Sequence, residues 1–190
     1  MTPPGEPPTV PLSEKTRAEI QAALTRYPQR RTAILPALRA AQRDAGYLGQ
    51  EQIEEVANLL ELDPNAVYML VTFYDMLYRE PKGRFVLGVC KNIACYLRGA
   101  DEIIEHLLDR LGVGLNETTG DGMFTVRPFE CLASCGTAPV ILINNEEYAE
   151  RLTIESVDRL LDELRARPFE AAGEHGIPWP ILQAEAANRG

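Results

Sequence analysis

The chain has 190 residues, of which 45% are hydrophobic, and a formal net charge of −9 at neutral pH. A chain of this size can bury a hydrophobic core without disulfide bonds, and its length allows one or two domains. The negative charge argues against nucleic acid and against anionic lipid headgroups as partners, because both present negatively charged phosphates.

The N-terminus, residues 1–12, is rich in proline and poor in large apolar side chains, which predicts a flexible tail. It has neither the basic start nor the apolar stretch of a secretory signal. The longest clearly apolar stretch, Ala138 to Ile143, is too short to cross a bilayer. We therefore expect a soluble intracellular protein with no direct membrane insertion, in a compartment that keeps thiols reduced.

Residues 13–79 place apolar side chains at helical spacing in four successive segments, which predicts a helical bundle. The expected helices run from Ser13 to Tyr27, from about Arg31 to Asp44, through residues 53–60, and from Pro64 to Met76. Asp63 and Pro64 form a helix start signal, with Asp as N-cap and Pro at the first helical position. Because the last of these helices carries no Arg or Lys, we disfavour a DNA-binding helix-turn-helix.

Residues 80–83 read as a turn-like linker, and residues 80–167 as a second, mixed domain. The expected strands are residues 84–89, 123–129, 140–143 and 147–149, and the expected helices are residues 99–111 and 154–166. A strand–helix–strand unit predicts a parallel pair, whereas Asn144-Asn145 predicts an antiparallel hairpin. The fold class is therefore α+β, a helical bundle followed by a small mixed sheet with helices packed on it.

The C-terminal segment, residues 168–190, combines prolines with Trp179 and several aliphatic residues. It is too short to fold alone and too apolar to remain in water without a contact. We expect a C-terminal tail that docks on its own domain or on a partner.

Four cysteines form two close pairs, Cys90 with Cys95 and Cys131 with Cys135, in a C-x4-C and C-x3-C arrangement. All four fall in segments that we interpret as loops leaving strands. This is the ligand number of a tetrathiolate metal centre. Small residues around the second pair let backbone N–H groups approach sulfur, and Lys91 beside Cys90 favours the thiolate. Gly136 leaves space beside Cys135.

The identity of the centre is less constrained than its ligands. The four-residue gap favours a [2Fe–2S] cluster over zinc, whose ligand pairs are usually closed by two to four residues, but zinc stays open. A thioredoxin-type redox pair or a covalent haem site would need C-x-x-C, which is absent. No Ser/His/Asp or paired-carboxylate arrangement predicts a catalytic site. The chain reads as an electron carrier without a substrate pocket of its own.

Two cysteine motifs identify a family resemblance, supported by Arg31 to Leu38 and by Val71-Thr72-Phe73-Tyr74. The motifs run from Cys90-Lys91-Asn92-Ile93-Ala94-Cys95 to Ala100 and from Glu130-Cys131-Leu132-Ala133-Ser134-Cys135 to Val140. The chain resembles the thioredoxin-like [2Fe–2S] ferredoxin subunits of NADH–quinone oxidoreductase (respiratory complex I), over about residues 13–165. A glycine common in this family is replaced by Ala133, which leaves ligation intact.

The resemblance implies that Cys90, Cys95, Cys131 and Cys135 bind one [2Fe–2S] cluster in a thioredoxin-like domain. It also implies an oxidoreductase complex in which a partner flavoprotein binds NADH and FMN. The complex would hold other peripheral-arm subunits and lie on the cytoplasmic side of the membrane. Similar subunits occur in NAD-linked hydrogenases and formate dehydrogenases, so the host complex stays open. Two other functions are weighed: a zinc-bound structural adaptor and a thiol–disulfide exchanger, the latter disfavoured because no C-x-x-C is present.

Overall fold

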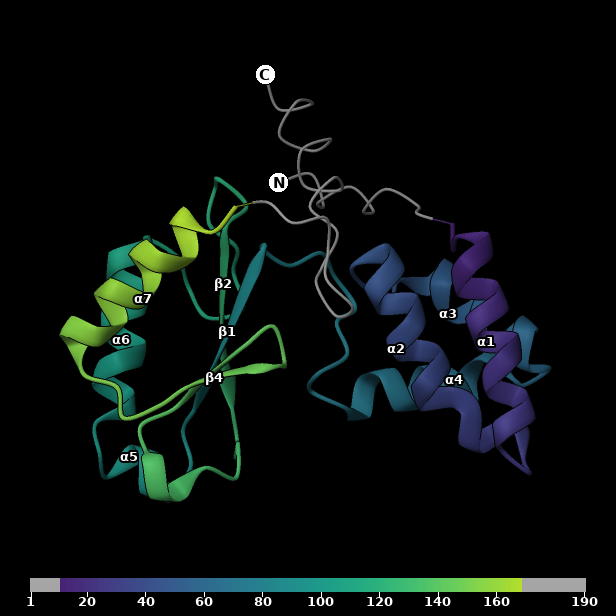
Figure 1. The fold of residues 1–190 in the computed structure, drawn as a ribbon, viewed down its shortest axis with the longest axis horizontal. Coiled ribbons are helices and arrows are strands. Elements are labelled where there is room, and N and C mark those ends of the chain that lie inside the picture. Colours follow the sequence, from purple (N-terminus) through teal and green to yellow (C-terminus); the bar gives the residue numbers. More distant parts are fainter. Residues whose placement is uncertain (1–10, 169–190) are drawn as a thin grey trace. The chain divides into compact units, whose positions relative to one another are not determined.

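The computed structural model describes residues 11–168, and the chain divides between Pro81 and Lys82 into two compact units. We call them the helical unit and the α/β unit, and Figure 1 shows the elements of each. Within residues 11–168, no helix is both long enough and apolar enough to span a membrane. The predicted tail that begins at residue 168 falls, from residue 169 onward, outside the described part of the chain.

The helical unit contains the four predicted helices, with one additional 3-10 turn. The elements are α1 (Glu14–Arg26), η1 (Arg30–Ala33), α2 (Ile34–Ala45), α3 (Gln50–Leu60) and α4 (Pro64–Phe73). The predicted start of α4 is confirmed, because the Asp63 side chain accepts a hydrogen bond from the Asn65 N–H at 2.8 Å. Two predicted bounds are wrong: the second helix begins with the η1 turn, and α4 ends at Phe73 rather than Met76.

The core of the helical unit lies where the apolar faces of its helices meet. Fully buried side chains come from every helix, namely Ile20, Leu38, Val56, Leu60 and Val67. Leu12, which the sequence assigned to the flexible tail, is also part of this core. Its N–H donates to the Glu55 carboxylate at 3.3 Å. The packed structure therefore begins before the predicted boundary at Ser13.

The α/β unit has the predicted order of strands and long helices, with two short helical turns added. Its elements are β1 (Phe85–Cys90), α5 (Ile93–Tyr96), α6 (Ala100–Leu111), β2 (Phe124–Phe129), η2 (Cys135–Thr137), β3 (Ile141–Ile143), β4 (Glu147–Ala149) and α7 (Ile154–Ala166). The strand order is β2-β1-β3-β4. As predicted, β1 and β2 are parallel, and β3 and β4 form an antiparallel hairpin.

Helices α6 and α7 lie side by side and cover the sheet (Figure 1). Their buried faces meet β1, β2 and β3 in a core built from Leu87, Leu107, Phe124, Val126, Ile141, Leu161 and Leu164. At the start of α7, the Thr153 and Ser156 side chains each accept a hydrogen bond from the other's backbone N–H. Such a reciprocal capping box satisfies two N–H groups that the helix itself cannot pair.

The predicted hairpin turn between β3 and β4 is confirmed. Asn144 and Asn145 have φ angles of 51° and 64°, in the left-handed region that asparagine tolerates, and the Glu146 N–H donates to the Ile143 carbonyl at 3.0 Å. The Asn144 amide also accepts from the Val86 N–H at 2.8 Å and donates to the Arg84 carbonyl at 3.1 Å. The turn is therefore fixed to β1, which ends at the first cysteine.

Candidate metal centre

Cys90 and Cys95 are both buried, with exposed fractions of 4% and 2%. Cys90 is the last residue of β1 and Cys95 lies on α5, so the expectation that both lie in loops is wrong. The short helix α5 starts where the Asn92 side chain accepts a hydrogen bond from the Ile93 N–H at 2.9 Å. This helical turn brings the second thiol back beside the end of the strand.

Cys131 and Cys135 are exposed and lie in the segment that follows β2. Cys135 opens the η2 turn, and Cys131 lies in the loop before it. Between them Ala133 takes the left-handed conformation with a φ of 57°. The Ala133 N–H points to the Cys131 sulfur at 3.4 Å. The predicted approach of a backbone N–H to a thiol of this pair is confirmed at Cys131.

The sheet explains why the two pairs lie at the same edge. In the parallel β1–β2 pair, Cys90 lies opposite Phe129, so both strands end at the same level and the second pair follows directly. The Lys91 N–H donates to the Phe129 carbonyl at 2.9 Å, and the Cys90 N–H donates to the Val140 carbonyl at 3.1 Å. The two buried cysteines share a small apolar core with Ala100, Phe129, Leu132, Ala138, Val140 and Leu142.

The environment of Cys95 holds its thiol in the protonated form. Burial raises the pKa of Cys95 to about 11, and the neighbouring Cys90 thiol adds to this rise. The Val140 N–H acts in the opposite direction, since it donates to the Cys95 sulfur. Metal binding therefore has to displace a proton from Cys95, and the Val140 N–H is ready to stabilise the resulting thiolate.

Lys91 forms an ion pair, and its predicted effect on the Cys90 thiol stays a prediction. Its ammonium nitrogen lies 3.0 Å from a Glu130 carboxylate oxygen, and both side chains are largely exposed. The reason is the strand register, which places residue 91 beside residue 130 just beyond the paired ends of β1 and β2. The positive charge is therefore already paired with a carboxylate.

The segment from Leu132 to Thr137 is anchored by residues on and after β4. The Tyr148 hydroxyl donates to the Leu132 carbonyl at 3.1 Å. The Glu150 carboxylate accepts from the Ser134 and Thr137 hydroxyls at 2.7 and 2.6 Å. These two hydrogen bonds hold the pKa of Glu150 below its usual value. We call Leu132–Thr137 the ligand loop, since it contains Cys135 and directly follows Cys131.

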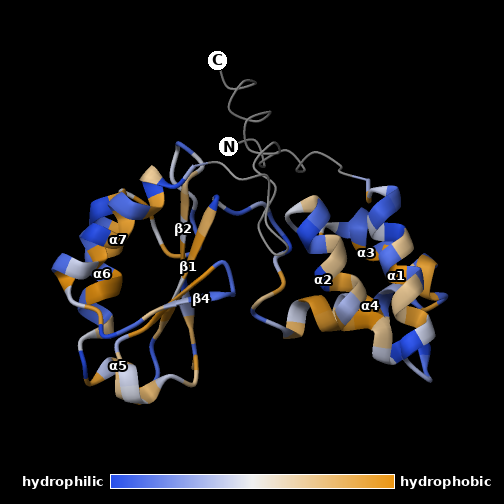
Figure 2. Cartoon of the chain, viewed as in Figure 1, coloured by the Kyte–Doolittle hydropathy of each residue, from blue (hydrophilic) through white to orange (hydrophobic). Residues whose placement is uncertain are grey.

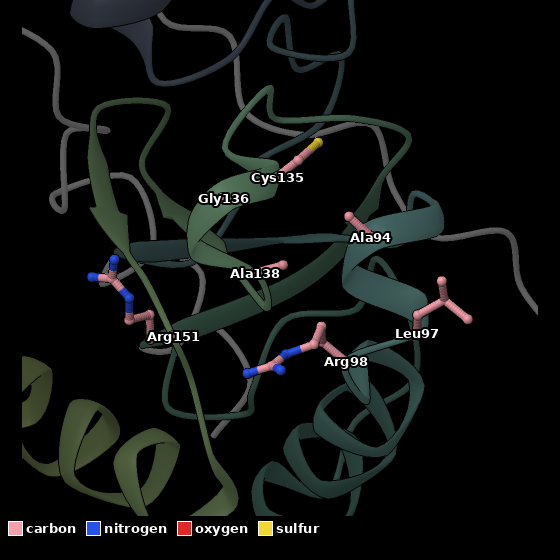
Figure 3. Close-up of a pocket in the computed structure, with 7 residues that line it drawn as sticks. All are labelled: Ala94, Leu97, Arg98, Cys135, Gly136, Ala138 and Arg151. Carbon is pink, nitrogen blue, oxygen red and sulfur yellow. The ribbon is translucent and has the colours of Figure 1, made fainter.

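A pocket of about 460 Å³ opens beside Cys135 (Figure 3). It is lined by Ala94, Leu97, Arg98, Cys135, Gly136, Ala138 and Arg151. A Cβ added at Gly136 would meet no heavy atom of the protein within 4 Å, and the role of this glycine in the approach of a cluster stays a prediction. The sequence did not predict that Arg98 and Arg151 line this pocket. It also did not predict α5, although Asn92 is an N-cap residue type and could have indicated the start of that helix.

The four thiols suit a metal cluster by their chemistry. All are free cysteines, and N–H donors point to two of the sulfurs, which stabilises thiolate ligands. The thiols of Cys90 and Cys135 both influence the titration of Cys95, so these three lie near one another. Within residues 11–168, however, no three His, Cys, Asp or Glu side chains are already arranged to hold a metal ion. The residues fit the group, and the exposed pair would have to close on it.

The sequence matches the model of the family described as thioredoxin-like [2Fe-2S] ferredoxin over residues 20–165. One relative, named as a subunit of the NADH-quinone oxidoreductase of Rhizobium meliloti, is 44% identical over 150 residues, which cover 79% of this chain and 89% of that protein. NADH-quinone oxidoreductase subunit 2 of Thermus thermophilus is 41% identical over 149 residues, covering 77% of this chain and 82% of that protein.

Among solved structures, one chain of an NAD+-reducing [NiFe]-hydrogenase in the air-oxidized state has a similar fold, with a TM-score of 0.59 and 21% identity. The match covers 68% of this chain and 22% of the hydrogenase chain. The family match and the two relatives together establish that this chain belongs to the thioredoxin-like [2Fe–2S] ferredoxin family. The predicted fold class and the predicted family are therefore confirmed.

Proposed function

We propose that this member of the thioredoxin-like [2Fe–2S] ferredoxin family is an electron-transfer subunit in the NADH-dehydrogenase module of an NADH–quinone oxidoreductase. The observation that carries the proposal is the placement of four free cysteines at one edge of the sheet, in a chain of this family. The names of two relatives, 44% and 41% identical, support the same host complex. The chain would act as part of an oxidoreductase and needs no substrate site of its own.

Cys90, Cys95, Cys131 and Cys135 would hold one [2Fe–2S] cluster. When bound, such a cluster accepts and releases single electrons, at a low potential if all its ligands are thiolates. The Val140 and Ala133 N–H groups would each stabilise a ligating sulfur. The Tyr148 hydroxyl would fix the start of the ligand loop through the Leu132 carbonyl.

We further propose that the partner is a flavoprotein that binds FMN and NADH, and that other peripheral-arm subunits surround the pair on the cytoplasmic side of the membrane. Support comes from the relatives, which are named as subunits of NADH-quinone oxidoreductases. The exposed position of Cys131 and Cys135 leaves one side of the centre open to a partner. An accessible centre suits transfer between subunits, because electrons must pass from one protein to the other over a short distance.

The test is iron and acid-labile sulfide analysis of anaerobically purified protein, with EPR before and after dithionite. Two irons and two sulfides for each chain, with an S = 1/2 signal only after reduction, would support the proposal. Cys131→Ser should lower the iron content, whereas the matched change Leu115→Ser, at an exposed residue that does not line the pocket beside Cys135, should leave it unchanged. Normal iron in Cys131→Ser would remove Cys131 from the ligand set. Zinc without iron would favour the structural adaptor instead.

A second host complex is favoured by one observation, the fold similarity to the hydrogenase chain. In that case the chain would be a diaphorase subunit of an NAD-linked hydrogenase or formate dehydrogenase, with the same cysteines as ligands. Affinity purification of the tagged chain from its own cells separates the two hypotheses. A quinone-reductase peripheral arm among the bound subunits supports the first host, and a hydrogenase or formate dehydrogenase subunit supports the second.

A further inference from the structure

Helix α4 exposes a continuous apolar stripe. The large residues on it are Tyr68, Met69 and Phe73, with exposed fractions of 45%, 58% and 76%. They recur at helical spacing with Asn65 and Thr72, and the helix carries no charged residue from Pro64 to Phe73. Figure 2 shows α4 as largely hydrophobic, although only Val67 and Val71 are buried. An exposed apolar stripe of this kind marks an interaction surface rather than ordinary surface variation.

The stripe leads into a pocket of about 390 Å³ between the start of α3 and the start of α4. Tyr68 belongs to both, and its hydroxyl accepts a hydrogen bond from the Arg79 guanidinium at 3.2 Å. The other lining residues are Leu48, Gly49, Gln50, Ile53, Glu54, Pro64 and Asn65. This mixed lining of apolar, aromatic and polar side chains suits a single large side chain that carries one donor.

The chain itself contains a segment of matching chemistry. Residues 176–182 read Gly-Ile-Pro-Trp-Pro-Ile-Leu, and Trp179 is the one tryptophan of the sequence. Prolines on both sides of a large apolar residue favour an extended polyproline II backbone, which loses little entropy on binding and commonly docks in aromatic-lined grooves. Trp179 offers an apolar ring with one N–H donor, which matches the mixed apolar and polar lining of the pocket.

The described chain ends beside a residue that follows the helical unit closely in sequence. The Arg84 guanidinium donates to the Arg167 and Pro168 carbonyls at 2.9 and 2.7 Å. The described chain therefore ends beside Arg84, which is close in sequence to the division between the units at Pro81. From Pro168, nine extended residues to Ile177 can span about 30 Å, which is comparable to the diameter of a small domain.

We propose that residues 176–182 dock on the helical unit of their own chain, with Trp179 in the pocket at Tyr68 and the flanking aliphatic residues along the α4 stripe. The contact covers an apolar surface that would otherwise face water. This interaction is independent of the metal centre and of the host complex.

The test uses the fluorescence of Trp179 in the full chain, purified anaerobically with its iron. Selective excitation of tryptophan reports this residue alone, and the emission wavelength is read rather than the intensity, which the metal centre can quench. We expect emission at shorter wavelength than in the synthetic peptide 169–190, with several-fold weaker quenching by acrylamide. Met69→Asp and Phe73→Asp should move both values toward those of the peptide. Leu115→Asp, a matched change at an exposed residue of the α/β unit, should leave them unchanged.

Several results would overturn the proposal. Trp179 could be as accessible in the full chain as in the peptide, and would then be undocked. It could be protected but unaffected by both stripe variants, and would then be bound elsewhere. Loss of protection on dilution, together with a dimer in size-exclusion chromatography, would identify a second copy as the occupant. Protection that arises only in the assembled complex would identify a partner subunit.

Discussion

Gly88 lies in the middle of β1, where the strand has room for a hydrogen but not for a methyl group. A Cβ added there would lie 2.5 and 2.6 Å from two ring carbons of Phe129, and 3.3 Å from the Leu142 carbonyl oxygen. Ordinary contacts of this kind are 3.4–4 Å. Gly88→Ala therefore requires the buried Phe129 ring to move by roughly 1 Å in a closely packed core.

Overpacking of this size costs about 1–3 kcal/mol. Replacement of glycine also restricts the unfolded chain, which stabilises the folded state by about 0.4–1 kcal/mol. The expected net loss in the free energy of unfolding is therefore about 1–2 kcal/mol. For a chain of this length each kcal/mol lowers Tm by about 2–4 °C, so the expected shift is about 2–8 °C.

The measurement is differential scanning calorimetry of the iron-containing protein at one fixed scan rate, since unfolding with loss of a metal centre is not reversible. Gly120→Ala is the matched control, because a Cβ there would meet nothing within 4 Å. Phe129→Val removes the ring that obstructs the methyl group. In that background Gly88→Ala should cost little, so the double-mutant cycle should give a clear coupling between the two positions.

A Tm for Gly88→Ala equal to that of Gly120→Ala would refute the packing argument. So would equal losses for Gly88→Ala with and without Phe129→Val, because the cost would then arise from something other than the ring. Either result would mean that β1 and β2 are spaced differently from the register described here.

Three further predictions concern the site and its supports. In iron-free protein, alkylation followed by mass spectrometry should modify the exposed thiols of Cys131 and Cys135 before the buried pair, and equal rates for all four would contradict their burial. Glu150→Ala should speed the loss of iron to a chelator with little change in Tm, because it frees two hydroxyls of the ligand loop, and an unchanged rate would oppose this role. Arg167 lowers the pKa of Glu147, so this pair should stabilise the fold above about pH 4.5 and stop doing so as pH falls through the lowered pKa. Glu147→Gln should therefore cost up to about 1 kcal/mol at neutral pH and nothing in acid, measured by urea unfolding at both pH values.

The elements that the sequence predicted well are those whose signal is local. Helix α7 matches its predicted bounds, Ile154 to Ala166, because its apolar residues repeat with the helical period over several turns. The turn at Asn144-Asn145 was predictable because asparagine tolerates the positive φ angles that a short hairpin needs. The Asp63-Pro64 start of α4 was predictable for the same kind of reason, a preference contained in two adjacent residues.

The helices whose bounds the sequence did not predict, α4 and α5, depend on contacts between distant residues or are too short to show a helical period. Helix α4 ends at Phe73, and the residues that follow it are held by Gln42 on α2. The Gln42 side chain accepts from the Tyr78 N–H at 2.6 Å and donates to the Met76 carbonyl at 2.9 Å. Contacts with a residue so distant in sequence are not contained in the apolar pattern that predicted a helix up to Met76. Helix α5 is one turn long, from Ile93 to Tyr96, so it has no period to detect.

For the metal centre, the spacing of the cysteines predicted a tetrathiolate set, and that ligand set stays a prediction. The spacing could not predict that Cys90 and Cys95 are buried while Cys131 and Cys135 are exposed. Nor could it predict the hydrogen bond from the Val140 N–H to the Cys95 sulfur. This hydrogen bond joins two residues that are distant in sequence. It depends on the path of the chain from the ligand loop into β3.

The difference between the two pairs has a consequence for how a cluster would be inserted. Cys90 and Cys95 belong to a strand and a helix and are buried, so their positions are fixed by the packing of the α/β unit. Cys131 and Cys135 are exposed, and in the segment between them Leu132 alone is buried, while the other anchors are hydrogen bonds to Tyr148 and Glu150. Exposed hydrogen bonds open more readily than packed cores, since water replaces the lost partners. The buried pair is thus the fixed half of the site and the exposed pair is its adjustable half, so metal entry and loss should proceed through the ligand loop.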